Sequence, residues 1–125
     1  MRLLIVLLAI VVATALNAAE VVVVDGDTFD VDGVRIRIAN IDAPEIHDAK
    51  CAAELRLGRR AASRLGQLLA GSDWHLVRSP DDPRDEDRYG RKLRRVLLAT
   101  GDAGDRLVAE GLARPWTGHR KPWCN

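Results

Sequence analysis

The sequence has few cysteines, little net charge and no internal repetition. Only two of its 125 residues are cysteine, Cys51 and Cys124, and no C-x-x-C or H-x-x-x-H spacing accompanies them, so no recognisable zinc site is encoded. The formal net charge at pH 7 is +1, which excludes overall charge as an argument for a polyanionic partner. The length excludes a second domain and allows one modest core.

The N-terminal region has the features of an export signal. A basic residue precedes an uninterrupted apolar run at residues 3–13, which is too short to span a bilayer comfortably. Small residues place the cleavage site after residue 15, 18 or 19. We therefore expect residues 1–19 to be a signal peptide and residues 20–125 to be the exported domain, periplasmic or secreted. An uncleaved N-terminal anchor is the alternative.

Export bears on the two cysteines, because disulfides form and persist in oxidising compartments. We expect Cys51 to pair with Cys124. This bridge would tie the end of the chain to its middle across about 70 residues and stabilise the fold by about 4 kcal/mol in the chain-entropy model. Two free thiols are the alternative.

Three strands are predicted in the first third of the exported domain. They are expected at residues 21–24, 28–31 and 34–38. A bend at residues 25–27 joins the first two, and Asp32-Gly33 is a two-residue hairpin signal. In the third strand Arg35 and Arg37 alternate with apolar residues, so one face is buried and the other projects guanidinium groups.

One main helix and one short helix are predicted in the remainder. The main helix, at residues 52–70, has Leu55, Ala62, Leu65 and Leu69 on one stripe. Gly58 inside it lowers helix stability by about 1 kcal/mol, and Gly71 ends it. Further elements are expected at 74–78 (strand), 79–87 (polar loop), 93–99 (strand) and 105–110 (short helix).

The order of these elements predicts an α+β, mainly β fold, namely a five-stranded OB-type Greek-key barrel with one main helix and one short helix. Barrels of this type commonly bind oligonucleotides, but the fold alone does not establish a function.

Three short motifs carry the candidate chemistry. They are Asp25-Gly26-Asp27-Thr28, the run RIANIDAPE at residues 37–45, and Asp87-Arg88-Tyr89-Gly90-Arg91. Each alone is a weak signal, since an Asp-Gly-Asp is usually a turn. In this order and at these separations, however, the motifs resemble the staphylococcal nuclease family. The resemblance extends over residues 21–113, which is nearly all of the exported part.

The resemblance implies a calcium site. The carboxylates of Asp27 and Asp42 and the backbone carbonyl of Ala43 match the family's calcium ligands, and Asp25 matches a carboxylate behind them. Ligation by oxygen alone is what a hard cation such as Ca²⁺ requires.

The resemblance also implies the catalytic groups of a nuclease acting on DNA or RNA. Glu45 matches the general base, Arg37 and Arg91 match the groups that hold the reacting phosphate, and Arg88 and Tyr89 match contacts to a neighbouring phosphate. Stabilising the extra charge of a five-coordinate phosphorus requires such cationic donors. The implied products carry 3′-phosphate ends, and we expect a monomer without a stable membrane span after processing.

The sequence departs from the family in two places. The segment at residues 46–50 is shorter than the family's loop, and the family's tyrosines that face the base fall near Thr117 and His119. Trp116 or Trp123 would supply base stacking in their place, and a buried or capping role for these tryptophans is the alternative. The main alternative is a noncatalytic OB-type nucleic-acid-binding module, and a second is an exported structural or interaction domain. The carboxylates of Asp27, Asp42 and Glu45 argue against the noncatalytic binding module, because binding nucleic acid does not require a carboxylate cluster that repels phosphate.

Overall fold

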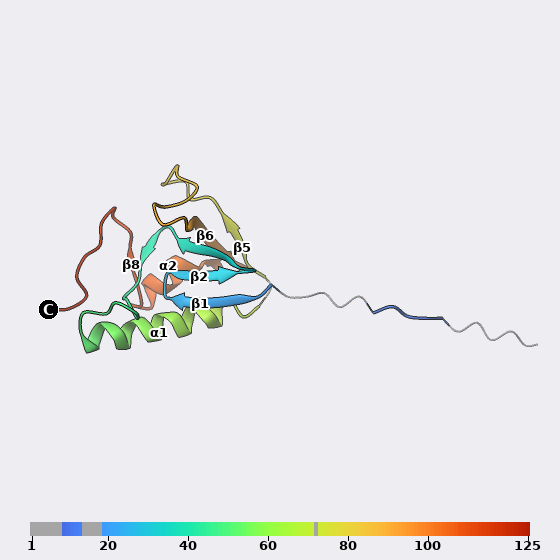
Figure 1. Cartoon of the computed structure of the whole chain (residues 1–125), viewed down its shortest axis with the longest axis horizontal. Helices are drawn as coiled ribbons and strands as arrows, with labels where there is room; N and C mark the ends of the chain where they lie inside the picture. The colour runs from blue at the N-terminus through green and yellow to red at the C-terminus, as the bar shows by residue number, and fades with distance from the viewer. Residues whose placement is uncertain (1–8, 14–18, 72) are drawn as a thin grey trace, which may run out of the picture.

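The N-terminal strands form the antiparallel meander that the sequence predicts. In the computed structural model, which describes residues 9–13, 19–71 and 73–125, β1 (Val21–Asp25), β2 (Thr28–Val31) and β3 (Val34–Ile38) pair in turn (Figure 1). A register shift near the end of β1 forms the expected bend. Asp32 and Gly33 both have positive φ, as the tight hairpin requires.

The predicted signal peptide falls mostly outside the described residues, which exclude residues 1–8 and 14–18. It therefore stays a prediction. Residues 9–13, from its apolar run, have no regular secondary structure. Within the part of the chain that the structure describes, no helix is long and apolar enough to cross a membrane.

The sheet continues from β3 into the second half of the chain. β3 pairs in parallel with β6 (Lys92–Leu98), which pairs antiparallel with β5 (His75–Val77) and with β7 (Gly101–Asp102). The strand order is β1-β2-β3-β6-β5. This arrangement is mainly β and OB-like, as predicted, although no pairing of β5 with β1 closes the barrel among the described residues.

A second, two-stranded sheet joins β4 (Ile41–Asp42) to β8 (Arg114–Pro115). The sequence did not predict it, because two-residue strands show no periodicity. This pairing places residues 114–115, near the end of the chain, beside the RIANIDAPE run at residues 37–45.

The main helix α1 (Ala52–Leu68) covers β1 (Figure 1). Leu65 and Leu69 are buried as predicted, but Leu55 and Ala62 are only partly buried. The predicted stripe was therefore wrong in part. The buried face passes through Gly58 and Ala61, because these small residues allow α1 to lie close to neighbouring backbone and side chains.

The short helix α2 (Ala103–Ala109) begins two residues before its predicted start. Asp102 caps it by accepting a hydrogen bond from the backbone N–H of Asp105 at 2.9 Å. Gly111, with φ of 74°, follows its end as predicted.

The core lies between the sheet and the two helices. Its largest fully buried aliphatic and aromatic side chains include Phe29, Ile38, Ile41, Leu65, Val96 and Leu107. Each contributes about 1.5–3 kcal/mol by burial. Because Ile38 and Ile41 flank the turn that leads to β4, the core fixes the segment from which the candidate site residues project.

Candidate active site

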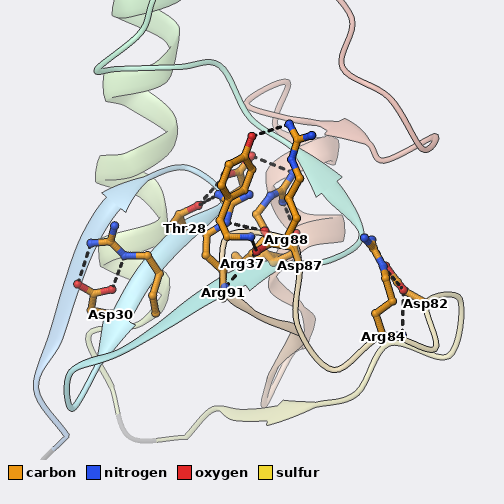
Figure 2. A network of polar contacts seen from close by, with 12 residues as sticks. Thr28, Asp30, Arg37, Asp82, Arg84, Asp87, Arg88 and Arg91 are labelled. Carbon is orange, nitrogen blue, oxygen red and sulfur yellow. Dashed lines mark hydrogen bonds and ion pairs between the residues drawn. The ribbon is translucent and has the colours of Figure 1, made fainter.

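An arginine-lined cavity of about 410 Å³ lies beside β3 and the loop that precedes β6. Within the described part of the chain, its cationic lining is Arg37, Arg84, Arg88, Arg91 and Arg120, and its carboxylates are Asp82 and Asp87. We call this cavity the arginine pocket. Figure 2 shows Arg37, Arg88 and Arg91 gathered at one place, with Arg84 on the loop to one side. The positive lining suits an anion, although the chain as a whole is nearly neutral.

Arg37 is the buried guanidinium of the pocket, with 6% of its surface exposed. Its Nη1 donates hydrogen bonds to the carbonyl oxygens of Ile38 and, at 2.8 Å, of Ile41. Its Nη2 lies 3.5 Å from a carboxylate oxygen of Asp27, and its Cζ lies 5.5 Å from the ring centroid of Trp116. Arg37 is therefore held in place, and it connects the pocket to the buried carboxylate of Asp27.

Arg91 is held by Asp87. Its Nε donates to one carboxylate oxygen of Asp87 at 2.7 Å, and its backbone N–H donates to the other at 3.0 Å. A further contact of 3.4 Å joins Nη1 to the hydroxyl of Thr28 on β2 (Figure 2). Burial raises the pKa of Asp87, but hydrogen bonds from Arg91 and Tyr89 together leave that pKa below its usual value.

Asp87 is thus a positioning residue that the sequence analysis did not single out. The sequence contains a hint of this role, because Asp87 lies four residues before Arg91 within the same motif. Two hydrogen bonds to one carboxylate fix both the backbone and the side chain of the arginine.

Arg88 and Tyr89 form the exposed rim of the pocket. Arg88 donates a hydrogen bond of 2.6 Å to the hydroxyl of Tyr89, and its guanidinium lies 4.8 Å from the ring centroid. Arg91 lies 5.4 Å from the same ring. Tyr89 remains 68% exposed, so a ligand can reach its ring. The same ring contacts the guanidinium groups of Arg88 and Arg91 and helps to fix their positions.

Two contacts relate the expected calcium ligands to one another and to the arginine pocket: Asp27 contacts Arg37 and the backbone of Ala43, which follows Asp42 in the chain. Asp27 is 1% exposed, and its two oxygens accept hydrogen bonds from the hydroxyl of Thr28 at 3.0 Å and from the backbone N–H of Ala43 at 2.8 Å. Asp25 accepts from the backbone N–H of Asp27 at 3.0 Å. Burial, followed by the charge of Asp27, raises the pKa of Asp25 to about 7.

Asp42 supplies the test of whether these residues fit a cation. Its Oδ1 is buried and has no hydrogen-bond partner among the described residues, which is costly for a carboxylate oxygen unless something else binds it. Burial raises the pKa of Asp42, while the charge of Arg120 opposes that rise. An orphaned oxygen beside a second buried carboxylate fits a hard cation.

Side chains alone do not complete a metal site. In residues 9–13, 19–71 and 73–125, no group of three His, Cys, Asp or Glu side chains is placed to hold a metal ion. A calcium ion bound by Asp27 and Asp42 would therefore need backbone or water oxygens, which is consistent with the predicted use of the Ala43 carbonyl.

Glu45 does not line the arginine pocket. It lies in an adjoining cavity of about 330 Å³, and its backbone N–H donates to the carboxylate of buried Glu54 at 3.2 Å. Its own carboxylate accepts a hydrogen bond from Nη1 of Arg120. Arg120 lines both cavities. The sequence analysis missed Arg120, because nothing local distinguishes it from the other basic residues near the C-terminus.

The chain is similar in sequence to known proteins. The family described as staphylococcal nuclease homologue matches residues 35–122. A micrococcal nuclease of Shigella flexneri is 33% identical over 132 residues, which cover 94% of this chain and 69% of that protein. The chain belongs to the staphylococcal nuclease family. The predicted resemblance is confirmed, and a nuclease-family function follows.

Two further relatives of this staphylococcal nuclease homologue have other names. Succinoglycan biosynthesis protein ExoI of Rhizobium meliloti (strain 1021) is 33% identical over 91 residues, and protein ParB of Escherichia coli is 38% identical over 89 residues. The matches cover 70% and 66% of this chain but only 46% and 42% of those proteins. The chain thus spans less than half the length of these two relatives.

The family match begins after the Asp-Gly-Asp motif. The structure nevertheless joins that motif to the matched region through the hydrogen bond between Asp27 and the backbone of Ala43. In this nuclease homologue the motif at residues 25–28 is therefore part of the same site as Arg37 and Asp42.

Proposed function

We propose that the protein is an exported, calcium-dependent nuclease that hydrolyses phosphodiester bonds of DNA or RNA and leaves 3′-phosphate ends. The observation that carries the proposal is an arginine pocket beside two buried carboxylates, Asp27 and Asp42, with Nη2 of Arg37 3.5 Å from Asp27. Family membership supports the nuclease class. The proposal goes beyond family membership in three respects: the use of calcium, the formation of 3′-phosphate ends and export.

Arg37 and Arg91 bind the reacting phosphate. Charge grows on its oxygens as phosphorus becomes five-coordinate, and donors already held in place stabilise that charge without reorganising. Two carbonyl oxygens fix Arg37, and the Asp87 carboxylate fixes Arg91. A guanidinium can donate paired N–H groups that match phosphate geometry.

Glu45 acts as the general base. It takes a proton from the attacking water, whose oxygen bonds to phosphorus while the bond from phosphorus to the 5′-oxygen breaks. The 5′-oxygen leaves and takes up a proton, and the phosphate stays on the 3′ side. The Glu54 carboxylate supports this role by holding the backbone of Glu45.

Asp27, Asp42 and the carbonyl of Ala43 would hold calcium, with Asp25 supporting Asp27 through its backbone N–H. When bound, calcium would supply Lewis-acid stabilisation of the phosphate oxygens and a site for the water. The unpartnered oxygen of Asp42 supports this assignment, as does the all-oxygen donor set.

We further propose that the protein is exported and acts as a monomer. The apolar run at residues 3–13 supports export. The structure joins Cys51 to Cys124, the pairing expected for an oxidising compartment.

The test is cleavage of labelled DNA and RNA oligonucleotides in calcium, in magnesium and in chelator, with the product ends mapped. The proposal expects cleavage in calcium, weaker cleavage in magnesium, none in chelator, and 3′-phosphate ends. Equal cleavage in all three conditions would contradict the metal assignment. Tight binding of the oligonucleotide without cleavage would instead favour the noncatalytic binding module.

A further inference from the structure

The chain after β8 is held at both of its ends. We call residues 116–124 the C-terminal segment. At its start the backbone N–H of Trp116 donates to the carbonyl of Asn40 at 3.0 Å. At its end Cys124 is disulfide-bonded to Cys51, the residue that caps α1. Between these anchors the segment passes from the arginine pocket to the cavity that holds Glu45.

Arg114 of β8 also holds the far part of this segment. Its Nη1 donates to the carbonyl oxygens of Pro122 at 3.0 Å and Lys121 at 3.4 Å. Its guanidinium lies 3.6 Å from the ring centroid of Trp123. The disulfide and Arg114 therefore place residues 121–124 beside the site, although the segment contains no helix or strand.

Arg120 is the residue that these anchors bring to the site. It lines the arginine pocket with Arg37 and Arg91, and its guanidinium pairs with the carboxylate of Glu45. One cation thus faces both the phosphate pocket and the proposed base.

The pairing of Arg120 is more exposed to solvent than that of Arg37. Arg37 is buried against carbonyl oxygens, whereas the Arg120 side chain is 46% exposed and that of Glu45 is 21% exposed. Ion pairs that water reaches contribute little free energy and are exchanged easily. A phosphate arriving in the pocket would offer Arg120 a stronger, doubly hydrogen-bonded partner.

We propose that Arg120 is a further substrate-binding residue, which exchanges Glu45 for the reacting phosphate and which the Cys51–Cys124 disulfide keeps in place. The exchange does two things. It adds a third guanidinium to the phosphate, and it frees the Glu45 carboxylate to accept the proton of the water. This inference rests on the proposed nuclease function of the same site.

The first test compares Arg120→Ala, Arg120→Lys and the matched control Arg56→Ala, which removes an exposed arginine of α1 that lines neither of the two cavities. Single-turnover and steady-state cleavage of a labelled oligonucleotide in saturating calcium give kcat and KM. Fluorescence anisotropy in chelator gives binding without cleavage, and circular dichroism checks the fold.

For Arg120→Ala we expect kcat/KM to fall about 10- to 100-fold and oligonucleotide binding to weaken, because a charge-assisted contact is lost. Arg120→Lys should recover part of both losses, and Arg56→Ala should stay within about threefold of the wild type. An Arg120→Ala variant equal to the control, or one with raised kcat/KM, would overturn the proposal. If the wild type does not cleave at all, the proposed function fails, but the binding comparison still decides whether Arg120 contacts the substrate.

The second test asks whether the disulfide acts through Arg120. Reduction with dithiothreitol should lower kcat/KM of the wild type toward that of Arg120→Ala and should change Arg120→Ala little further, because both perturbations remove the same contact. Equal fold-losses on reduction in both proteins would refute the role of the disulfide. Should the reduced protein unfold, Cys51→Ser/Cys124→Ser measured at a temperature where it is folded gives the same comparison.

Discussion

A Cβ atom on Gly58 would lie 2.7 Å from the carbonyl oxygen of Glu45 and 2.9 Å from that of Pro44. Helix α1 therefore touches the backbone that carries the proposed base. Gly26 has a similar role, since its Cβ would lie 2.6 Å from that of Ala61 and 2.8 Å from that of Ala43. Both glycines allow the helix to support the site directly.

Replacing Gly58 with alanine tests this packing. We expect Gly58→Ala to lower the free energy of unfolding by about 1–3 kcal/mol, because the new methyl group must displace backbone rather than a flexible side chain. Turnover should fall as well, since the displaced backbone carries Glu45. The measurements are urea unfolding and cleavage rate.

Gly66 provides the control, because it lies in the same helix and its Cβ would meet only a methyl group of Val23 at 3.8 Å. Gly66→Ala should be neutral or stabilise by about 0.5–1 kcal/mol. Equal unfolding free energies for the two variants would show that the close approach at Gly58 does not matter.

Removing the disulfide should destabilise the protein. The Cys51–Cys124 bridge closes a loop with a sequence separation of 73, and the chain-entropy model gives about 4 kcal/mol for a loop of this length. We expect Cys51→Ser/Cys124→Ser to unfold at correspondingly lower urea, with m-values compared to detect a change in the denatured state. An unchanged unfolding midpoint would mean that the bridge does not constrain the unfolded chain.

Asp87→Asn should impair catalysis through Arg91. The substitution keeps the shape but weakens both hydrogen bonds that hold the arginine, so we expect kcat to fall about tenfold with little change in melting temperature. Asp81→Asn is the control, because Asp81 pairs with Arg95 and is largely exposed. A kcat for Asp87→Asn as high as that of this control would remove the positioning role.

Asp85 makes the loop before β6 sensitive to acid. Hydrogen bonds from Lys92 and Arg94 lower the pKa of Asp85 to about 2, below an unfolded value near 3.9. A carboxylate with a lowered pKa stabilises the fold above the unfolded pKa and loses that contribution as the pH falls through the folded pKa. The contribution of Asp85 is therefore present above about pH 4 and lost toward pH 2.

Urea unfolding of the wild type and Asp85→Asn at pH 5, 3 and 2 checks this expectation. The wild type should be the more stable at pH 5, and the difference in unfolding free energy should shrink as the pH falls. Because the carboxylate is well exposed, the difference is expected to be small. A difference that is the same at all three pH values would contradict the assignment.

Much of the fold was predictable from local patterns. The alternation in β3, the Asp32-Gly33 turn and the extent of α1 each depend on residues that are close together in the sequence. The helix face was predicted less well, because the burial of Gly58 depends on the backbone of Pro44 and Glu45, which packs against it from outside the helix. The two-residue pairing of β4 with β8 is likewise set by the tertiary fold.

In the candidate site, too, the residues within motifs were predicted and a residue placed by distant contacts was not. Motifs predicted Asp27, Arg37, Asp42 and Arg91, and the structure gathers them through contacts such as that between Arg37 and Asp27. Arg120 was not predicted, because its contact with Glu45 joins residues 75 positions apart, and the expected disulfide does not say which nearby side chain meets Glu45. Sequence spacing alone carries no information about such a contact.

The most direct test of the account is the turnover of Glu45→Gln in saturating calcium. The substitution keeps the shape of the side chain but removes its ability to accept the proton, so kcat should fall about 100-fold or more while oligonucleotide binding is retained. Arg91→Ala should lower kcat by a similar order, and Arg56→Ala should change it less than about threefold. Near wild-type kcat for a folded Glu45→Gln protein would contradict the account, because another group or the solvent would then take the proton.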